Sequence, residues 1–458
     1  MFAGREHELK RLEGMFESDK FECVIIHGRW CAGKTALLQK FLSGKNALYF
    51  AAQETSCGEN LRDFAERIEA FSRNAEAKNR EIASFEDAFE QIYLLSRTER
   101  TVLIIDDYHL LAAAQRGISK LICDQIEQRL IDSKLMLIIC GSSPPVMERE
   151  TLSYHSPFHG KRTSQIEVRP LNFFETRRHF GSFSPYDIAV VFGVTGGVPK
   201  YIDLMDPEIP IEENIKRTMF NTSSLMFEEP VNILRREVRD LTYYNAILRA
   251  ISSGHCKNSE IASAVSLETS ACTAYLKNLI AFGIVGKHTP MTEKAGKKTI
   301  YSIKDSMFRF WYRFIPKNMS LIKSGVTDRI WRNVAREMPS FMGTVFEDIC
   351  RQWLEQQNQN SRLPATFVEF GRWWGVDPVW KAEVSLPIVA YADDNHAIFG
   401  DCVWSDQPAH SGALVSLVER SRLFRFNNKH IYLFSRSGFS EECADAAHRV
   451  GANLVMFE

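Results

Sequence analysis

The sequence predicts an α/β fold, and three patterns along the chain support this prediction. Up to about Pro144, short apolar segments alternate with segments of helical spacing, which is typical of a parallel sheet covered by helices on both faces. Residues 242–303 have the pattern of three helices followed by a hairpin, and residues 341–458 return to mixed α and β. We therefore expect a parallel-sheet domain, a helical region, a helix–hairpin module and a second α/β domain, in that order.

Apolar runs predict the individual strands. In the first domain, the predicted strands are Phe21–His27, Leu48–Ala52, Thr101–Ile105 and Leu135–Cys140. Helical spacing predicts helices over Thr35–Leu42 and Asn60–Leu95, and the stretch from Leu171 to about Arg239 has a helical but irregular pattern. In the last domain, the predicted strands are Thr366–Phe370, Pro387–Ala392, Ala397–Val403 and Lys429–Phe434.

Composition excludes several classes of protein. The 458 residues carry a net charge of −1, so a contact with DNA must come from a local basic patch. The ten cysteines include no Cys-x-x-Cys pair, which argues against structural zinc and suggests free thiols in a reducing cytosol. No apolar run reaches the roughly 18 residues of a membrane span, and no signal core follows the start. We expect a cytoplasmic protein without a membrane partner.

A glycine-rich segment follows the first predicted strand and precedes a predicted helix. Its residues fit the G-x-x-x-x-G-K-[ST] pattern: Gly28, Arg29, Trp30, Cys31, Ala32, Gly33, Lys34 and Thr35. In such a loop the backbone N–H groups surround phosphates, the lysine reaches the β- and γ-phosphates, and the hydroxyl ligates magnesium. The pattern predicts a site for ATP with Mg²⁺; a glycine turn with an exposed lysine is the alternative.

The strand Val102–Ile105 ends in the acidic pair Asp106 and Asp107. We expect Asp106 to hold the magnesium ion, directly or through water. Asp107 stands where many ATPases place a glutamate that orients the attacking water, and its shorter side chain predicts slow hydrolysis. Alternatively, both acids cap the next helix. A fourth strand ends in Gly141, Ser142 and Ser143, where either serine hydroxyl would sense the γ-phosphate or form a plain turn.

Together these motifs resemble the archaeal-type P-loop ATPases, which are relatives of the STAND and AAA+ proteins. The resemblance covers nearly the whole chain and includes the following segments: 2–6, 28–35, 104–107, 141–143, 160–162, 196–201, 308–314, 346–347, 371–375 and 400–404. It implies a P-loop NTPase core at 1–168, a helical lid at 169–239, a winged helix-turn-helix at 240–305, connecting helices at 306–340, and a degenerate endonuclease-like domain at 341–458.

The resemblance also implies further nucleotide contacts. Gly4 and Arg5 should lie near the adenine, and Pro199 should touch the nucleotide from the lid. Arg162 is expected to contact the γ-phosphate, either in the same chain or from a neighbouring subunit, and to offset charge during phosphoryl transfer. A solvated basic turn is the alternative for Arg162, and a plain helix start is the alternative for Pro199.

The middle module contains a candidate DNA-binding surface. The hairpin tip carries Lys287, His288, Lys294, Lys297 and Lys298, which would grip phosphates. The third helix offers base-reading candidates but no arginine: Ser270, Thr273, Lys277 and Asn278. DNA binding, protein docking and a purely structural winged helix all stay open. The aromatic run 308–314 suggests either base stacking or, more simply, a packing helix.

The last domain resembles a restriction-endonuclease-like fold without its full catalytic set. Such a nuclease needs an Asp and a [DE]-x-Lys pair that bind magnesium and position water. Here Asp401 keeps an acid but Val403 replaces the lysine, and Glu347 and Glu383 remain as scattered acids. We expect the fold without nuclease activity.

The resulting expectation is a nucleotide-driven switch whose later domains contact DNA or a protein. The alternative is a DNA-binding regulator in which ATP is structural and turnover is negligible. The sequence assigns no oligomeric state.

Overall fold

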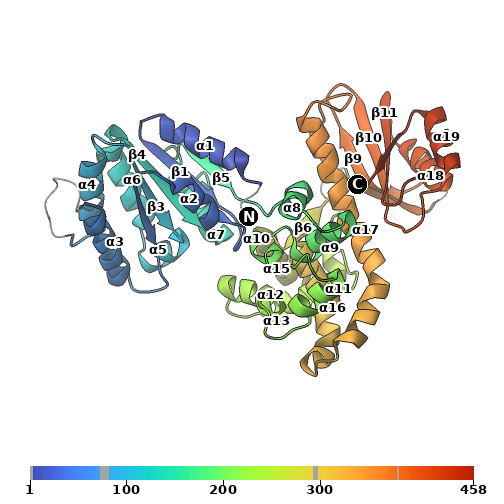
Figure 1. Cartoon of the computed structure of the whole chain (residues 1–458), viewed down its shortest axis with the longest axis horizontal. Helices are drawn as coiled ribbons and strands as arrows, with labels where there is room; N and C mark the ends of the chain where they lie inside the picture. The colour runs from blue at the N-terminus through green and yellow to red at the C-terminus, as the bar shows by residue number, and fades with distance from the viewer. Residues whose placement is uncertain (1–3, 73–81, 292–297, 379–380, 458) are drawn as a thin grey trace. The chain divides into compact units, whose positions relative to one another are not determined.

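The computed structural model describes residues 4–72, 82–291, 298–378 and 381–457. The chain forms two compact units. The first comprises Met1–Leu171 with Val198–Lys200, and the second comprises Asn172–Gly197 with Tyr201–Glu458. Figure 1 labels the elements of both.

The first unit is built on a five-stranded parallel sheet in the order β2-β3-β4-β1-β5. Its strands are β1 (Glu22–His27), β2 (Ala47–Ala51), β3 (Thr101–Asp106), β4 (Leu135–Gly141) and β5 (Ser164–Glu167). The predicted parallel sheet is confirmed. Because every pair is parallel, the carboxyl ends of all five strands lie at one edge of the sheet.

Helices cover both faces of this sheet (Figure 1). They are α1 (Glu6–Glu17), α2 (Lys34–Leu42), α3 (Cys57–Ser72), α4 (Phe85–Ser96), α5 (Tyr108–Ala114), α6 (Ile118–Gln128) and α7 (Pro144–Met147). Alternate residues of β1 separate the two cores, since Val24 packs with α1 and α2 whereas Ile25 packs with α3, α4 and α6. This double burial explains why the strand sequences are continuous apolar runs.

Two details of the first unit differ from the sequence expectation. The helical segment expected over Asn60–Leu95 is divided into α3 and α4, and the Ser84 hydroxyl begins α4 by accepting a hydrogen bond from the Asp87 N–H at 3.1 Å. The strand β5 was not predicted, because only its alternate residues Ser164 and Ile166 are buried.

The second unit begins with helices and a small hairpin. The helices are α8 (Phe173–His179), α9 (Pro185–Thr195), α10 (Pro199–Ile202, which the division of units crosses), α11 (Ile211–Met219), α12 (Leu225–Glu237), α13 (Thr242–Ser252), α14 (Asn258–Ala264) and α15 (Thr269–Ala281). The hairpin strands β6 (Val285–His288) and β7 (Ile300–Ile303) pair antiparallel after α15. The order of three helices and a hairpin agrees with the expected pattern, whereas Lys294 and Lys297 lie outside the described residues.

Two long helices follow, α16 (Ser306–Lys323) and α17 (Thr327–Gln359). The aromatic run in α16 is a packing surface, because Phe308, Phe310 and Phe314 are fully buried and the Trp311 indole donates a hydrogen bond to Phe227 O at 2.7 Å. The domain boundary expected at 340–341 is wrong at this point, since α17 continues through it. Buried residues recur at helical spacing on both sides of the boundary, and the helix continues although Pro339 lies in its interior.

The chain ends in a mixed sheet in the order β12-β11-β10-β9-β8. Its elements are β8 (Glu369–Val376), β9 (Glu383–Tyr391), β10 (His396–Val403), α18 (Ser411–Ser421), β11 (Asn428–Ser435), α19 (Glu441–Val450) and β12 (Asn453–Met456). The strands β8, β9 and β10 pair antiparallel, and β10, β11 and β12 pair parallel. The C-terminal mixed α/β domain is therefore confirmed.

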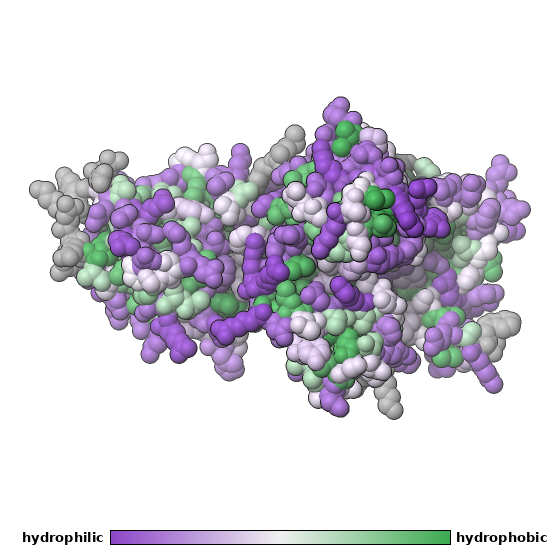
Figure 2. Space-filling view, turned by 90° about the horizontal axis from the view of Figure 1, so that it is seen from below, coloured by the Kyte–Doolittle hydropathy of each residue, from purple (hydrophilic) through white to green (hydrophobic). Residues whose placement is uncertain are grey.

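One face of the molecule is largely polar. Figure 2 shows a face dominated by hydrophilic side chains, with small and separate apolar patches. Among the described helices, none combines the length and the apolar character that a bilayer crossing requires.

Candidate nucleotide site

The glycine loop between β1 and α2 has a backbone that requires glycine at two positions. A Cβ on Gly28 would lie 2.1 Å from the carbonyl oxygen of Val168, the residue that follows β5. Gly33 has a φ of +92°, in the left-handed region, and directly precedes α2. The close approach of Val168 and the sharp entry into the helix therefore explain both glycines.

The side chain of Lys34 is folded over this loop. Its ammonium donates hydrogen bonds to the carbonyl oxygens of Gly28 and Arg29, both at 2.9 Å. Burial lowers the pKa of Lys34, and the nearby Asp106 carboxylate opposes that effect. A buried ammonium that rests on loop carbonyls is placed to exchange them for phosphate oxygens, which are stronger acceptors.

Asp106, at the end of β3, lies beside Thr35 at the start of α2. The Thr35 hydroxyl donates a hydrogen bond to Asp106 Oδ2 at 3.2 Å, and the Tyr49 hydroxyl donates to the same oxygen at 2.5 Å. The structure thus brings together the two residues expected at the metal. Tyr49 was missed by the sequence analysis, because a tyrosine inside an apolar strand such as β2 gives no signal of function.

The donor set here fits magnesium rather than a metal held only by protein groups. No group of three or more His, Cys, Asp or Glu side chains suited to a metal occurs in residues 4–72, 82–291, 298–378 and 381–457. One carboxylate and one hydroxyl leave most coordination positions to water and phosphate oxygens, which is how Mg²⁺ is held in phosphate-binding sites. Asp106 and Thr35 are the residues that would hold it.

Asp107 has an unusual backbone. Its φ of +49° lies in the left-handed region, which aspartate tolerates better than most residues. It directly precedes α5, but its side chain makes no capping hydrogen bond to that helix. The geometry therefore gives no support to the capping alternative for Asp107, and its role toward water stays a prediction.

His109 is a further residue at this edge that the sequence analysis missed. Its Nδ1 accepts a hydrogen bond from the Ser142 N–H at 3.5 Å, which links α5 to the end of β4. Burial, with a contribution from Lys34, lowers the pKa of His109 to about 4. A neutral imidazole thus lies near Lys34 and Asp106. The sequence signal that could have identified His109 is its place two residues after the acidic pair Asp106 and Asp107.

Arg5 and Pro199 both lie against the glycine loop. The Arg5 side chain is 5% exposed, and its guanidinium donates hydrogen bonds to Ala32 O at 2.8 Å and to Arg169 O at 2.5 Å. Pro199 Cγ lies 3.6 Å from the position of a Cβ on Gly33. The buried Gly4 precedes Arg5 with a φ of +76°. The adenine contacts expected of Gly4, Arg5 and Pro199 stay predictions.

Four further residues complete the loop between Gly28 and Gly33. Arg29, Trp30 and Cys31 are partly exposed, and Ala32 is buried. Cys31 has a φ of +63°, so this loop turns through the left-handed region at a residue other than glycine. This conformation is uncommon for a side-chain-bearing residue and is typical of functional loops.

Arg162 does not reach this site within one chain, which corrects one of the two expectations for it. It precedes β5, whose residue Ser164 pairs with Val24, and the Thr163 N–H donates to Cys23 O at 2.8 Å. This register places Arg162 at the amino-terminal edge of the sheet. The glycine loop begins at the opposite edge, roughly 15 Å away along β1. The Arg162 guanidinium instead donates to Thr151 O at 2.7 Å.

The acids of the C-terminal domain are bound to arginines. Asp401 on β10 pairs with Arg420, and Glu347 on α17 accepts a hydrogen bond from Arg372 at 2.8 Å. Burial raises the pKa of Glu347. Val403 lies two residues after Asp401 on the same strand and hence on the same face, where a nuclease lysine would stand.

Comparisons with known proteins agree with this geometry. Residues 2–205 match a family model described as an ATPase domain predominantly from Archaea, and residues 311–415 match one described as archaeal and bacterial proteins of unknown function. An uncharacterized protein of Methanocaldococcus jannaschii is 29% identical over 408 residues, which cover 89% of this chain and 88% of that protein.

Two further matches concern the N-terminal region and the fold. An uncharacterized ATP-binding protein of the same organism is 42% identical over 45 residues, covering 10% of this chain and 76% of that protein. The solved structure of a Walker-type ATPase of Pyrococcus abyssi aligns with a TM-score of 0.54 and 19% identity, covering 68% of this chain and 96% of that chain. Residues 2–205 are therefore similar to archaeal ATPase domains and share the fold of a Walker-type ATPase, and residues 311–415 are similar to the second family.

Proposed function

We propose that this protein binds ATP with Mg²⁺ in the glycine loop, hydrolyses it slowly, and uses the cycle as a switch. One observation carries the proposal: Lys34, Thr35 and Asp106 converge at the carboxyl edge of the parallel sheet, where α2 begins. The helix start supplies N–H groups and a positive dipole end to the triphosphate, and Lys34 supplies charge. Asp106 and Thr35 supply oxygen ligands to the metal.

Asp107 and His109 complete the proposed chemistry. Asp107 lies one residue beyond the metal ligand and would orient the attacking water, with a shorter reach than glutamate. His109 is neutral at physiological pH and hydrogen-bonded to the backbone of Ser142, so it is suited to contact the γ-phosphate without adding charge. Arg162 would act only on the nucleotide of a second copy.

The readout of the switch is proposed to lie in the second unit. The helices α13, α14 and α15 with the hairpin β6–β7 follow the order of a winged helix-turn-helix. Two of its candidate base readers are already engaged, because Thr273 accepts from Asn258 at 2.8 Å and Asn278 donates to Tyr244 at 2.7 Å. Ser270 and Lys277 are exposed and stay available for DNA or for a protein partner.

The C-terminal domain is proposed to be an inactive nuclease-like domain. Asp401 is held by Arg420, and Val403 offers neither a charge nor a hydrogen bond where the catalytic lysine would stand. Incubation of the protein with linear and supercoiled DNA in Mg²⁺ should leave both uncut. Cleavage that disappears in Asp401→Ala would contradict this assignment.

Nucleotide binding is tested by replacing Lys34. We expect Lys34→Ala to lose binding of a fluorescent ATP analogue and to lose phosphate release, because the ammonium would contact the β- and γ-phosphates. Lys40→Ala is the matched control, since Lys40 is exposed on the same helix. Unchanged affinity for the analogue in Lys34→Ala would refute the site.

The second candidate is a DNA-binding regulator in which bound ATP is structural. The shorter acid Asp107 and the lysines Lys287, Lys294, Lys297 and Lys298 favour it. It predicts tight nucleotide binding with negligible phosphate release, together with DNA retention that weakens steeply with salt. Single-turnover measurement of phosphate release, made with and without DNA, distinguishes the two candidates.

A further inference from the structure

A cleft of about 580 Å³ lies in the second unit, between the hairpin, α16, α17 and β8. This volume is in the range of small-molecule sites. Among the described residues that line it, six are Lys or Arg and two are Asp or Glu. The six are Lys287, Lys304, Arg309, Arg313, Arg351 and Arg372.

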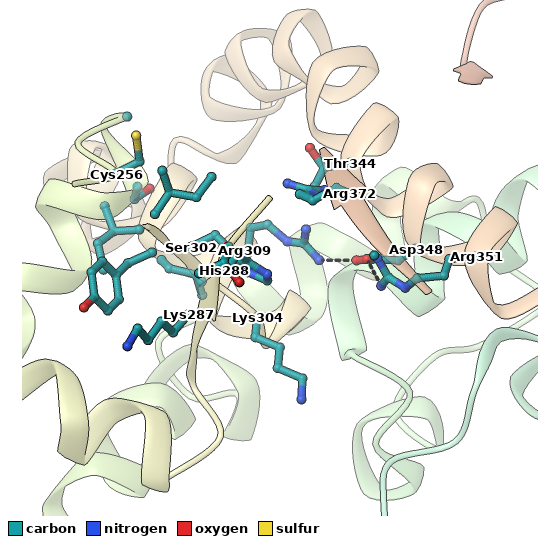
Figure 3. A pocket seen from close by; sticks show the side chains of 18 of the residues that line it. Cys256, Lys287, His288, Ser302, Lys304, Arg309, Thr344, Asp348, Arg351 and Arg372 are labelled. Atoms are coloured by element: carbon teal, nitrogen blue, oxygen red, sulfur yellow. Dashed lines mark hydrogen bonds and ion pairs between the residues drawn. The ribbon is translucent and has the colours of Figure 1, made fainter. Parts of the chain in front are cut away.

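Asp348 organises two of these arginines (Figure 3). Its carboxylate accepts a hydrogen bond from Arg309 at 3.0 Å and one from Arg351 at 2.6 Å. Burial disfavours the charged carboxylate, but the two guanidinium groups outweigh this effect and lower the pKa of Asp348. One carboxylate therefore fixes two guanidinium groups in place, and Glu355 lies 3.9 Å from Arg351 and offsets part of the remaining positive charge.

The hairpin contributes a second part of the cluster. His288 shares a hydrogen bond with Ser302 at 2.8 Å, and the ring fits there because residue 286 is glycine: a Cβ would lie 2.7 Å from His288 Nε2. Burial, with contributions from Arg372 and Arg351, lowers the pKa of His288 to about 4. A neutral histidine thus lies among cations from three elements: Lys304 after β7, Arg351 of α17 and Arg372 of β8.

Two cationic side chains of the cleft, Lys304 and Arg309, are not fully engaged by other groups of the protein. Among the described residues, no carboxylate pairs with Lys304, which is exposed. The Nε of Arg309 is buried and has no hydrogen-bond partner in the part of the chain that the structure describes. An exposed lysine without a carboxylate partner and an arginine with an unsatisfied donor in one cleft favour an anion with several acceptor oxygens.

The hairpin is held in position over the cleft. The Met291 N–H donates to Arg372 O at 2.9 Å, and the Trp374 indole donates to Lys298 O at 3.2 Å. Met291 is buried in the core of the C-terminal domain, where Gly371 leaves room for its sulfur. The cationic groups are therefore preorganised, which reduces the entropy cost of binding.

We propose that this cleft binds a phosphate-bearing ligand of nucleotide size, at a site separate from the glycine loop. Phosphate is favoured over a carboxylate because arginine and lysine side chains from several elements line the cleft, and a tetrahedral anion has three or more oxygens to accept their hydrogen bonds. The source is either a free nucleotide or the end of a nucleic-acid strand, and both present the same phosphate group to the cleft.

The test uses the full chain with the Lys34→Ala substitution and without added ATP, so that the glycine loop does not take the probe and no nucleotide competes for the cleft. The probe is a fluorescent deoxytrinucleotide with a 5′-phosphate, and its affinity is measured by fluorescence anisotropy. We expect Lys304→Gln and Arg372→Gln each to weaken binding about ten-fold or more, as loss of one charge-assisted hydrogen bond implies. Lys323→Gln is the control, since Lys323 is exposed at the end of α16 and does not line the cleft.

Further measurements identify which molecule carries the phosphate and test whether the variants still fold. Arg372→Lys keeps the charge and should recover most of the affinity that Arg372→Gln loses, while Lys304→Gln changes an exposed side chain and should keep the unfolding temperature. Competition by adenosine monophosphate would identify a free nucleotide, and competition only by phosphorylated oligonucleotides would identify a strand end; either supports the site. Equal affinity with and without the Lys304→Gln and Arg372→Gln substitutions overturns it, and so does absence of binding for all these probes.

Discussion

The hydroxyl of Tyr49 on β2 and the carboxylate of Asp106 on β3 are joined by a hydrogen bond of 2.5 Å. Both strands end at the same edge of the sheet, because β2 and β3 are parallel and Ala51 pairs with Asp106. Burial and the Asp106 carboxylate raise the pKa of Tyr49, so the phenol remains a donor at physiological pH. Tyr49 therefore orients the carboxylate proposed to hold magnesium.

Tyr49→Phe should raise the Mg²⁺ concentration needed for half-maximal binding of the ATP analogue. Loss of a group that orients a metal ligand typically costs about ten-fold in metal affinity. A magnesium titration followed by fluorescence measures the change, and Tyr93→Phe on α4 is the control. An unchanged magnesium requirement in Tyr49→Phe would show that Asp106 needs no such support.

Gly28→Ala should destabilise the first unit and distort the loop. The added methyl group meets the backbone oxygen of Val168, which cannot rotate away, and overpacking of this kind costs about 1–3 kcal/mol. Gly14→Ala is the opposite case, because Gly14 lies in α1 with no atom within 4 Å of a Cβ, and it should stabilise by about 0.5–1 kcal/mol. Denaturant unfolding measures both; equal effects would contradict the steric argument.

His109 predicts a pH dependence of stability. Its pKa falls from 6.5 to about 4 in the folded protein, so the unfolded chain binds more protons between these two values. The free energy of unfolding should therefore decrease as the pH falls from about 6.5 towards 4, and this contribution should be constant above that window.

Denaturant unfolding at several pH values tests this relation. His109→Gln should reduce the slope of unfolding free energy against pH within the window, whereas His7→Gln on the exposed start of α1 should leave the slope unchanged. A slope that is the same in wild type and His109→Gln would mean that the imidazole is as readily protonated in the folded chain.

Arg162→Ala should leave the nucleotide affinity of a single chain unchanged, because its guanidinium lies at the edge of the sheet opposite the loop. The variant should lose about 1 kcal/mol of stability with the hydrogen bond to Thr151 O. Analogue binding at low protein concentration measures the affinity. A weaker affinity there would contradict the placement, whereas a hydrolysis rate that depends on protein concentration and on Arg162 would indicate action on a second copy.

Sequence reasoning succeeded where the determining interactions are local. The apolar runs of β1, β3 and β4 are buried on both faces, so their composition identifies them, and the glycine spacing identifies the loop. The convergence of Thr35 and Asp106 followed from strand order, because the carboxyl ends of parallel strands share one edge.

The wrong and missed predictions have a common physical cause. Each concerns a strand or residue whose place in the fold depends on partners distant in the sequence. The strand β5 is short and alternates Ser164, Gln165, Ile166 and Glu167, so only its pairing with β1 defines it. The same pairing decides that Arg162 lies away from the loop. Tyr49 and His109 are significant only because Asp106 and Ser142 lie beside them in the fold.

The helix α17 runs unbroken for 33 residues, a length of roughly 50 Å. Phe341 on its first half packs against Phe310 and Phe314 of α16, and Phe346 and Trp353 on its second half pack against aromatic residues of the C-terminal domain. This one helix therefore packs against both the helical region and the C-terminal domain. Pro339 lies inside this helix, two residues before Phe341, and because proline cannot donate the backbone hydrogen bond of a helix interior, any bend in the helix is expected there.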